Sequence, residues 1–340
     1  MKAIIMAGGE GRRLRAVSGS LPKPMVSLLG KPMMEHIIQL LKENGFEDIC
    51  VTLRYKAQDI INYFGNGSRF GVKIQYRVEQ DVLGTAGSVK NCEDFYGNDD
   101  FLVISGDAAC DFKLKELMEK HVQSNACASL ALYRINEPLS YGLAVTDENN
   151  RVRCFVEKPD WQRVVTNLVN SGIYVLSPKA MSYVPKNTAF DFGKELFPLL
   201  LERGETIMGH ELSGYWCDVG SPLSYYRCCV DALEGRLKID IPHSFYVESK
   251  NESPEPAAQG LSSDCSCKNR AELMAALSQI AMDLGADYSD GLKITKPHYH
   301  LHIAPLPRQS AVRLSVQSED AEFASSLAQT ARELIKALDL

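Results

Sequence analysis

The sequence predicts an α/β protein with a mostly parallel mixed sheet that is covered by helices on both faces. Short apolar segments typical of β-strands alternate with segments of helical periodicity through the first half of the chain. Such alternation favours a parallel sheet, because the crossover between two parallel strands usually contains a helix. A glycine-rich turn directly follows the first strand, at the edge where ligands bind to sheets of this kind.

Individual elements follow from residue type and period. Strands are expected at residues 3–7, 49–53, 73–78, 101–105 and 128–133, and helices at 33–43, 57–64, 86–92 and 114–124. Pro32 and Gly45 flank the first of these helices, as Pro and Gly often do. From Tyr141 onwards the pattern changes to a hairpin at 143–146 and 152–156, a strand at 172–176 and a helix at 193–202.

The chain has 340 residues, which is enough for two domains. We expect the first domain at residues 1–240, a linker at 241–268 and a second, small α+β domain at 269–340. Residues 250–268 are rich in Pro, Ser and Asn, as linkers are. The small domain is indicated by two apolar helical faces, near 273–284 and 323–338, with alternating strands at 299–303 and 312–316 between them.

Charge and composition exclude several classes of protein. The net charge of −6 disfavours a surface for nucleic acid or for an anionic membrane. No apolar run approaches the roughly 18 residues of a membrane helix. The ten cysteines are scattered, and Cys265 and Cys267 have no partners at zinc-site spacing. We therefore expect a reduced, cytoplasmic protein without membrane or nucleic-acid partners.

The most informative segment is the turn after the first strand. Gly8, Gly9 and Gly11 let a backbone approach a ligand closely, and Arg12 and Arg13 follow them directly. Lys23 stands between two prolines that restrict its backbone. Together these groups suit a nucleoside triphosphate. The spacing matches neither the P-loop motif nor the dinucleotide motif. A glycine turn beside a solvated basic patch is the alternative, and the flanking prolines disfavour it.

Several motifs in the same order resemble those of the sugar-1-phosphate nucleotidylyltransferases, and most closely those of the mannose-1-phosphate guanylyltransferases. The resemblance covers residues 1 to about 240. It rests on Gly8-Gly9-Glu10-Gly11-Arg12-Arg13-Leu14, Pro22-Lys23-Pro24, Leu83-Gly84-Thr85-Ala86-Gly87, Asp107, Tyr141-Gly142, Glu157-Lys158-Pro159, Asn170-Ser171-Gly172-Ile173-Tyr174 and Trp216-Cys217-Asp218-Val219-Gly220. It implies a Rossmann-like fold of the nucleotide-diphospho-sugar transferase type. Arg12 is a departure, because the family usually has Thr there.

The resemblance also implies a reaction and a site. The phosphate oxygen of a sugar 1-phosphate attacks the α-phosphate of the triphosphate, and pyrophosphate leaves. The implied catalytic residues are Arg13 and Lys23, and Mg²⁺ is held by Asp107 and Asp218. Gly8, Gly9, Gly11, Arg12, Gly84 and Thr85 bind the nucleotide, and the sugar phosphate is bound by Gly142, Glu157, Lys158 and Asn170.

Taken singly, some of these residues have simpler interpretations. Asp107 is a possible helix N-cap and Asp218 a possible turn residue. Gly84-Thr85 also suits an ordinary helix start, and Glu157-Lys158 suits a surface ion pair. Only the ordered set of motifs favours the functional interpretation.

Three functions stay open at this point. The first is transfer of a guanylyl group from GTP to mannose 1-phosphate. The second is the same reaction with glucose 1-phosphate and UTP, dTTP or ATP. The third is a non-catalytic regulatory subunit that senses a nucleotide sugar. We expect a homo-oligomer in each case.

The C-terminal segment resembles the last domain of the phosphohexomutases, with Asp290-Gly291-Leu292-Lys293-Ile294 as its first strand. The phosphate loop of that family is reduced to Ala304-Pro305-Leu306-Pro307-Arg308-Gln309-Ser310. Mutase activity is therefore not expected, and a structural, oligomerising or regulatory role is the default. His298, His300 and His302 alternate along a predicted strand. Successive members would lie roughly 6.5 Å apart, which favours a polar sheet face over a metal site.

Overall fold

The computed structural model describes residues 1–18, 20–136, 138–160, 163–241, 260–268, 273–274, 276–278, 286–287, 291–306, 311–318 and 320–338. The chain divides into two compact units. The first unit consists of Met1–Glu10, Leu21–Met25 and Pro32–Asp218, and the second of Gly11–Ser20, Val26–Lys31 and Val219–Leu340.

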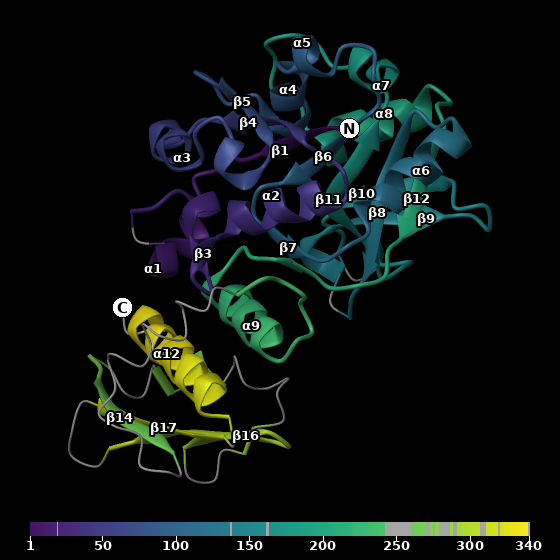
Figure 1. The fold of residues 1–340 in the computed structure, drawn as a ribbon. Coiled ribbons are helices and arrows are strands. Elements are labelled where there is room, and N and C mark those ends of the chain that lie inside the picture. The colour runs from purple at the N-terminus through teal and green to yellow at the C-terminus, as the bar shows by residue number, and fades with distance from the viewer. Residues whose placement is uncertain are drawn as a thin grey trace. The chain divides into compact units, whose positions relative to one another are not determined.

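The first unit is built on a mixed sheet (Figure 1). In the described part of the chain the sheet has nine strands in the order β10-β9-β11-β6-β1-β4-β5, with β8 next to β11 and β12 next to β8. The strands are β1 (Lys2–Met6), β4 (Asp48–Leu53), β5 (Lys73–Val78), β6 (Phe101–Ser105), β8 (Ala128–Arg134), β9 (Gly142–Thr146), β10 (Val152–Glu157), β11 (Leu168–Leu176) and β12 (Ile207–Glu211).

The middle of this sheet is parallel. Strand β1 lies between β6 and β4, with Ile4 opposite Val103 on one side and Cys50 on the other. Strand β5 extends the parallel part beyond β4, and β11 turns the sheet antiparallel beside β6. The carboxyl ends of β1, β4, β5 and β6 therefore meet at one edge of the sheet, where the predicted ligand-binding segments follow them.

Helices cover both faces of the sheet because neighbouring side chains of a strand point to opposite sides. Ile5 and Ile4 of β1 belong to two separate apolar clusters. The Ile5 cluster includes residues of α2 (Met33–Glu43), α3 (Ala57–Phe64) and α6 (Leu114–Ser124). The Ile4 cluster includes residues of α4 (Gly84–Lys90), α5 (Glu93–Tyr96), α7 (Pro178–Ser182) and α8 (Phe197–Glu202). The predicted fold class, a mostly parallel mixed sheet between two layers of helices, is confirmed.

Two helices of the first unit differ from the sequence prediction. The helix predicted at 86–92 begins at Gly84 and ends at Lys90. The helix predicted at 193–202 consists of a π-helical turn at Phe192–Leu196, followed by α8. Pro198 lies just after that junction and has no N–H to donate, which disfavours a continuous α-helical ladder.

Short elements occur in both units. Strands β7 (Ala108–Cys110) and β13 (Trp216–Asp218) form an antiparallel pair in which Asp218 lies opposite Ala108. The remaining short elements are η1 (Arg12–Leu14), α1 (Arg15–Ser18), η2 (Lys23–Met25), β2 (Ser27–Leu28), β3 (Lys31–Pro32), η3 (Ser68–Phe70) and η4 (Pro138–Ser140).

The second unit contains a four-stranded antiparallel sheet in the order β14-β17-β16-β15. Its elements are α9 (Pro222–Leu233), β14 (Leu261–Ser266), β15 (Leu292–Lys296), β16 (Tyr299–Pro305), β17 (Ala311–Ser318) and α12 (Ala321–Leu338). Helix α9 begins with a capping box, in which Ser221 and Ser224 each accept a hydrogen bond from the backbone N–H of the other. Helix α12 lies between the sheet and α9 (Figure 1).

The structure corrects the predicted linker. Residues 241–268 are expected to connect the domains, but β14 occupies Leu261–Ser266 and pairs with β17 along its whole length. Its side chains alternate between half-buried and exposed, as they do in a strand at the edge of a sheet. The Ser and Cys content of this segment concealed that alternation. Residues 242–259 and most of the helix predicted at 273–284 lie outside the described residues.

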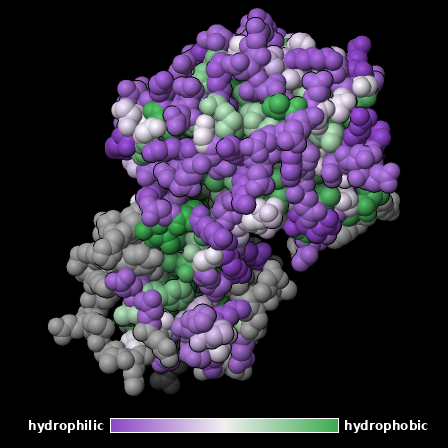
Figure 2. All heavy atoms as spheres, turned by 45° about the vertical axis from the view of Figure 1, so that its right-hand side comes forward, coloured by the Kyte–Doolittle hydropathy of each residue, from purple (hydrophilic) through white to green (hydrophobic). Residues whose placement is uncertain are grey.

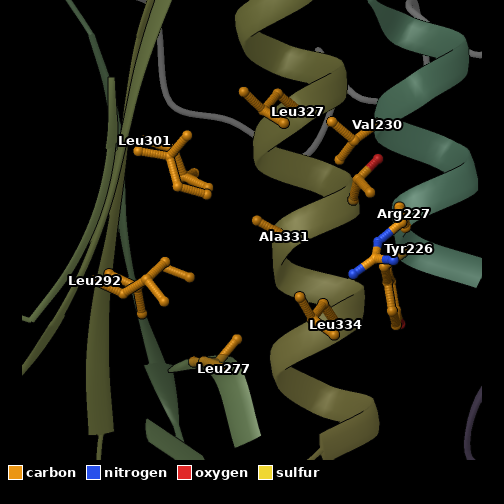
Figure 3. A pocket seen from close by; sticks show the side chains of 12 residues that line it. Tyr226, Arg227, Val230, Leu277, Leu292, Leu301, Leu327, Ala331 and Leu334 are labelled. Carbon is orange, nitrogen blue, oxygen red and sulfur yellow. The ribbon is translucent and has the colours of Figure 1, made fainter. Parts of the chain in front are cut away.

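The core of the second unit lies between α12 and the sheet. Leu292 and Leu301 extend from the strands towards α12, and Ala331 faces them from the helix (Figure 3). The small side chain of Ala331 leaves a gap there, and a cavity of about 50 Å³ results. A cavity of this size is a packing defect between large and small side chains and is too small for a metabolite.

The surface of the first unit is mostly hydrophilic on the face shown in Figure 2. Within the described ranges, no helix has the length and apolar character needed to cross a lipid bilayer. All ten cysteines are free thiols. The sulfur atoms of Cys50 and Cys92 lie 3.6 Å apart in the core.

Candidate functional site

A cluster of three charged side chains lies at the carboxyl edge of the parallel strands. The Lys23 ammonium forms an ion pair with Oδ2 of Asp107. Oδ1 of Asp218 lies 3.8 Å from the same ammonium nitrogen. The Lys23 side chain is only 10% exposed, whereas the two aspartates are about one-third exposed, at 31% and 33%. The structure therefore brings together one predicted catalytic residue and both predicted metal ligands.

Three separate parts of the chain deliver these groups. Asp107 follows β6 in a tight turn, and the N–H of Gly106 donates to the carbonyl of Met6 at the end of β1, 2.8 Å away. The pairing of β13 with β7 brings Asp218 next to this turn. Lys23 begins the short helix η2, and the carbonyl of Pro22 accepts a hydrogen bond from the N–H of Met25. Asp107 is thus in a turn between strands, so its interpretation as a helix N-cap is wrong.

The charges of the cluster stabilise one another. Burial alone would raise the pKa of the Asp107 carboxyl. The charge and hydrogen bond of Lys23 outweigh that effect, and the Ser105 hydroxyl also donates to Asp107, so the pKa of Asp107 lies below its ordinary value. The carboxylate is therefore ionised at neutral pH, as a metal ligand must be.

The donor set at this cluster fits Mg²⁺ that is partly coordinated by a ligand. In the part of the chain that the structure describes, no three His, Cys, Asp or Glu side chains converge on a possible metal position. Mg²⁺ commonly takes only one or two carboxylates and completes its shell with phosphate oxygens and water. Asp107 and Asp218 supply that number of carboxylates, and neither is fully buried.

The glycine-rich turn is divided between the two units. Gly8 and Gly9 belong to the first unit, and Gly11, Arg12 and Arg13 to the second. No described atom lies within 4 Å of a Cβ placed on Gly9, and the nearest atom to one on Gly8 is 3.7 Å away. Packing within the protein therefore does not require glycine at either position. Arg12 and Arg13 are both exposed at the start of η1, after Gly11 in a left-handed conformation.

The loop predicted to contact the base has a different reason for its glycines. Gly84 has φ +67°, and a Cβ there would lie 2.7 Å from the carbonyl oxygen of Phe190. That carbonyl accepts hydrogen bonds from the N–H groups of Ala86 and Gly87, at 2.9 and 3.0 Å. The hydroxyl of Thr85 donates to Asp191 at 2.9 Å. The loop is thus hydrogen-bonded to the 190–191 segment, and the single hydroxyl proton of Thr85 is donated there.

Glu79 is a further candidate, which the sequence did not single out within the loop at residues 79–87. It directly follows β5, and its side chain is among the buried polar groups, with the residue 8% exposed. Its Oε1 atom is buried and has no hydrogen-bond partner among the described residues. Burial raises the pKa of Glu79, against the opposing effects of Ser88 and Arg54. Its position could have been found from the sequence, because a carboxylate at the carboxyl end of a predicted parallel strand lies where ligands bind.

Two of the predicted sugar-phosphate residues, Gly142 and Glu157, lie together at the end of β10. A Cβ on Gly142 would lie 2.7 Å from Oε2 of Glu157, and one on Gly193 would lie 2.8 Å from the same atom. Burial raises the pKa of Glu157, and the charge of Asp191 raises it further. The charges of Lys158 and Lys194 act in the opposite direction. Glu157 is therefore held between two backbones, unlike one half of a solvated surface ion pair.

Lys158 and Asn170 have identifiable local roles. Lys158 has φ +44°, and its N–H donates to the carbonyl of Tyr141 at 3.1 Å. Asn170 accepts from the N–H of Gly172 at 3.1 Å and donates to the Tyr174 hydroxyl at 2.9 Å. The register of β11 against β8 shifts at this point, so Asn170 stabilises a bulge. Their contact with a sugar phosphate stays a prediction.

Asp191 is the second residue that the sequence analysis missed. It is the N-cap of the turn at Phe192–Leu196, and its own N–H donates to Glu195 at 2.7 Å. An Asp followed by a Glu just before an apolar run is a recognisable signal of a helix start. The link from Asp191 to Thr85 could not be found that way, because it joins residues 106 positions apart.

Comparisons with known proteins identify the family of the chain. A family model described as nucleotidyl transferase matches residues 2–235. A mannose-1-phosphate guanyltransferase of Debaryomyces hansenii is 36% identical over 268 residues, which are 76% of this chain and 73% of that protein. A UTP–glucose-1-phosphate uridylyltransferase of Synechocystis is 34% identical over 256 residues, 71% of this chain. The match spans 66% of that relative, just under two thirds of its length.

Solved structures show the same fold. A putative glucose-1-phosphate thymidylyltransferase from Bacillus anthracis aligns with a TM-score of 0.64 and 27% identity, over 72% of this chain and 98% of that one. HddC from Yersinia pseudotuberculosis complexed with GMP-PN aligns with a TM-score of 0.59 and 30% identity, over 68% and 99%. From the family match over residues 2–235 and these relatives, we conclude that the chain belongs to the nucleotidyl transferase family.

Proposed function

We propose that the protein transfers a nucleotidyl group from a nucleoside triphosphate to a sugar 1-phosphate and releases pyrophosphate. The observation that supports this most is the position of Lys23 between Asp107 and Asp218 at the carboxyl edge of the parallel strands. A phosphate oxygen of the sugar phosphate forms a bond to the α-phosphorus. The bond from that phosphorus to the bridging oxygen of the β-phosphate breaks, and pyrophosphate leaves with the electron pair.

The protein's part in such a transfer is mostly positioning and charge stabilisation. A buried ammonium at the α-phosphate would stabilise the negative charge on the phosphoryl oxygens in the transition state. In this proposal Arg13 and the N–H groups of the glycine turn bind the β- and γ-phosphates. Asp107 and Asp218 hold Mg²⁺, which neutralises phosphate charge when it is bound.

The preferred triphosphate in this proposal is GTP, and Glu79 is the reason within the chain. An ionised carboxylate only accepts hydrogen bonds, and its two oxygens can accept from two neighbouring donors. Guanine offers such a pair in its N1–H and 2-amino groups. Uracil and thymine offer one N–H between two carbonyl oxygens, which a carboxylate repels. The buried Oε1 of Glu79 lies beside the loop predicted to contact the base.

Mannose 1-phosphate is the preferred acceptor in this proposal, and its support comes from the relatives alone. Several of them are named mannose-1-phosphate guanyltransferases, while one is a UTP–glucose-1-phosphate uridylyltransferase. The experiment is a panel of GTP, UTP, dTTP and ATP against mannose and glucose 1-phosphates, with pyrophosphate release as the readout. Turnover with UTP, dTTP or ATP in place of GTP would contradict the guanylyl assignment, and no turnover with any pair would favour the regulatory subunit.

A variant of Glu79 makes the base assignment testable. E79Q replaces one acceptor oxygen by a donor NH₂ group, which suits uracil better than guanine. We expect the ratio of kcat/KM for GTP to that for UTP to fall by roughly 10- to 100-fold, since a good bidentate pair contributes discrimination of that order. D81N is the matched control, because Asp81 is exposed in the same loop. An unchanged ratio in E79Q would remove Glu79 from base recognition.

A further inference from the structure

Asp191 is the point where two binding loops of the first unit meet. Its Oδ2 atom accepts a hydrogen bond from the Thr85 hydroxyl at 2.9 Å. Its Oδ1 atom accepts from the N–H groups of Gly193 at 2.9 Å and Lys194 at 3.1 Å. The two carboxylate oxygens therefore face different parts of the structure, one towards the base-side loop and the other towards the turn at Phe192–Leu196.

The contact with the base-side loop is more than a single hydrogen bond. Thr85 is also an acceptor, because the N–H of Phe192 donates to its hydroxyl oxygen at 2.9 Å. The N–H of Phe190 donates to the carbonyl of Leu83 at 2.9 Å. Since a Cβ on Gly84 would collide with Phe190, no side chain separates the two segments. A displacement of Thr85 must therefore move the 190–192 segment as well.

The other side of the same turn contacts the predicted sugar pocket. Gly193 follows Asp191 by two positions, and its Cα lies so close to Glu157 that a Cβ would be 2.8 Å from Oε2. Gly142, on the neighbouring strand β9, confines the same oxygen: a Cβ on Gly142 would lie 2.7 Å from Oε2 of Glu157. A shift of Gly193 must therefore move the Glu157 carboxylate. The charge of Asp191 also acts on Glu157, whose pKa it raises.

We propose that Asp191 is a positioning residue that couples nucleotide binding to sugar-phosphate binding. A base that binds the loop at Gly84 and Thr85 restrains the position of Thr85. Through the hydrogen bonds of Asp191 this restrains Gly193, and the contact of Gly193 with Glu157 then holds that carboxylate in position for the sugar. Coupling of this kind is reciprocal, so the sugar phosphate must strengthen nucleotide binding by the same factor. The inference rests on the function proposed above, because it takes the two ligands from it.

The experiment measures a coupling factor by calorimetry on the full chain. The dissociation constant of mannose 1-phosphate is measured with and without saturating non-hydrolysable GTP analogue. The coupling ratio is the dissociation constant without the analogue divided by the constant with it. We expect this ratio to be roughly 5 or more in the wild type, the lower end of typical allosteric coupling. T85V keeps the shape of the side chain but removes the hydroxyl that joins Asp191 and Phe192. The ratio in T85V is expected to fall towards 1.

Three further variants separate coupling from a general loss of structure. T85S restores the hydroxyl and should restore the ratio. S182A is the control on α7: the exposed Ser182 hydroxyl donates to the carbonyl of Lys179 at 2.7 Å, away from both loops, so the wild-type ratio should persist. D191N keeps one carbonyl oxygen, which can serve either Thr85 or the helix amides but not both. The coupling ratio of D191N should fall as in T85V. Thermal unfolding of the variant checks that it is folded.

The two proposals fail in different ways. A wild-type ratio near 1, or a wild-type ratio retained in T85V and D191N, overturns the role of Asp191 while pyrophosphate release can still proceed. Absence of turnover with every pair in the panel overturns the proposed function, while the calorimetric ratio can still be large. If a pair other than GTP and mannose 1-phosphate turns over, the same measurement with that pair and its non-hydrolysable analogue decides the coupling.

Discussion

Lys23 and Asp107 form an ion pair across 84 positions of the chain. The lysine side chain is almost fully buried, although a lone buried ammonium would cost several kcal/mol of desolvation. Two carboxylates, those of Asp107 and Asp218, offset that cost. The pair places a positive charge at the edge of the sheet where ligands of parallel sheets bind.

Removing the ammonium should abolish most of the transfer activity. K23M keeps much of the side-chain volume and removes the charge. We expect kcat for pyrophosphate release to fall by roughly 100- to 1,000-fold, as for the loss of one group that stabilises transition-state charge. K73M is the control, since the Lys73 side chain is 87% exposed. Near-normal kcat in K23M would exclude Lys23 from the reaction.

Neutralising either aspartate should weaken the response to Mg²⁺. D107N and D218N each remove one anionic oxygen from the two that fit a metal with phosphate ligands. The Mg²⁺ concentration for half-maximal rate is expected to rise by roughly tenfold or more, comparable to the loss of a metal-supporting group. D99N, with a side chain that is 67% exposed, is the control. If both variants follow the wild-type Mg²⁺ titration, the two aspartates are not the ligands.

The contact between Gly84 and Phe190 should make position 84 intolerant of any side chain. A Cβ there would lie 2.7 Å from the Phe190 carbonyl oxygen. Gly204, which follows α8, has a similar φ, +73°, but no described atom lies within 4 Å of its Cβ position. G204A should therefore cost only the left-handed backbone, about 1–2 kcal/mol of unfolding free energy. G84A should cost about 1–3 kcal/mol more from overpacking. Equal losses in urea unfolding would contradict the close approach.

His210 should make the protein less stable in mild acid. Burial, together with Lys120 and His121, lowers the pKa of His210 from 6.5 to about 4. Between these values an unfolded His210 takes up a proton and the folded one does not. Protons therefore favour unfolding, and stability falls as the pH drops from 6.5 to 4. The loss is at most about 3 kcal/mol. H210Q should flatten this part of the stability curve, whereas H300N, at an exposed position, should leave it unchanged.

Most helices and strands could be predicted from the sequence, because their signals come from residues within a few positions of one another. The apolar strands that became β1, β4, β5 and β6 have the period and composition of buried strands. Helix α2 begins after Pro32 and ends before Gly45, as those residues indicate. The polar strand β14 was missed because its partner β17 lies about 50 positions away and its composition is that of a linker. Sheet edges with few apolar residues give a weak local signal.

The site divides in the same way. The sequence alone determined which side chains of the motifs bear charge and that Lys23 has a restricted backbone. Only the tertiary structure decided that Lys23 pairs with Asp107 and Asp218, that Glu79 is buried, and that Asp191 joins Thr85 to Gly193. The physical reason is distance along the chain. Residue type and spacing express interactions within a few positions, whereas the pKa of Asp107 and the need for glycine at position 84 depend on atoms that folding brings from about 80 to 110 positions away.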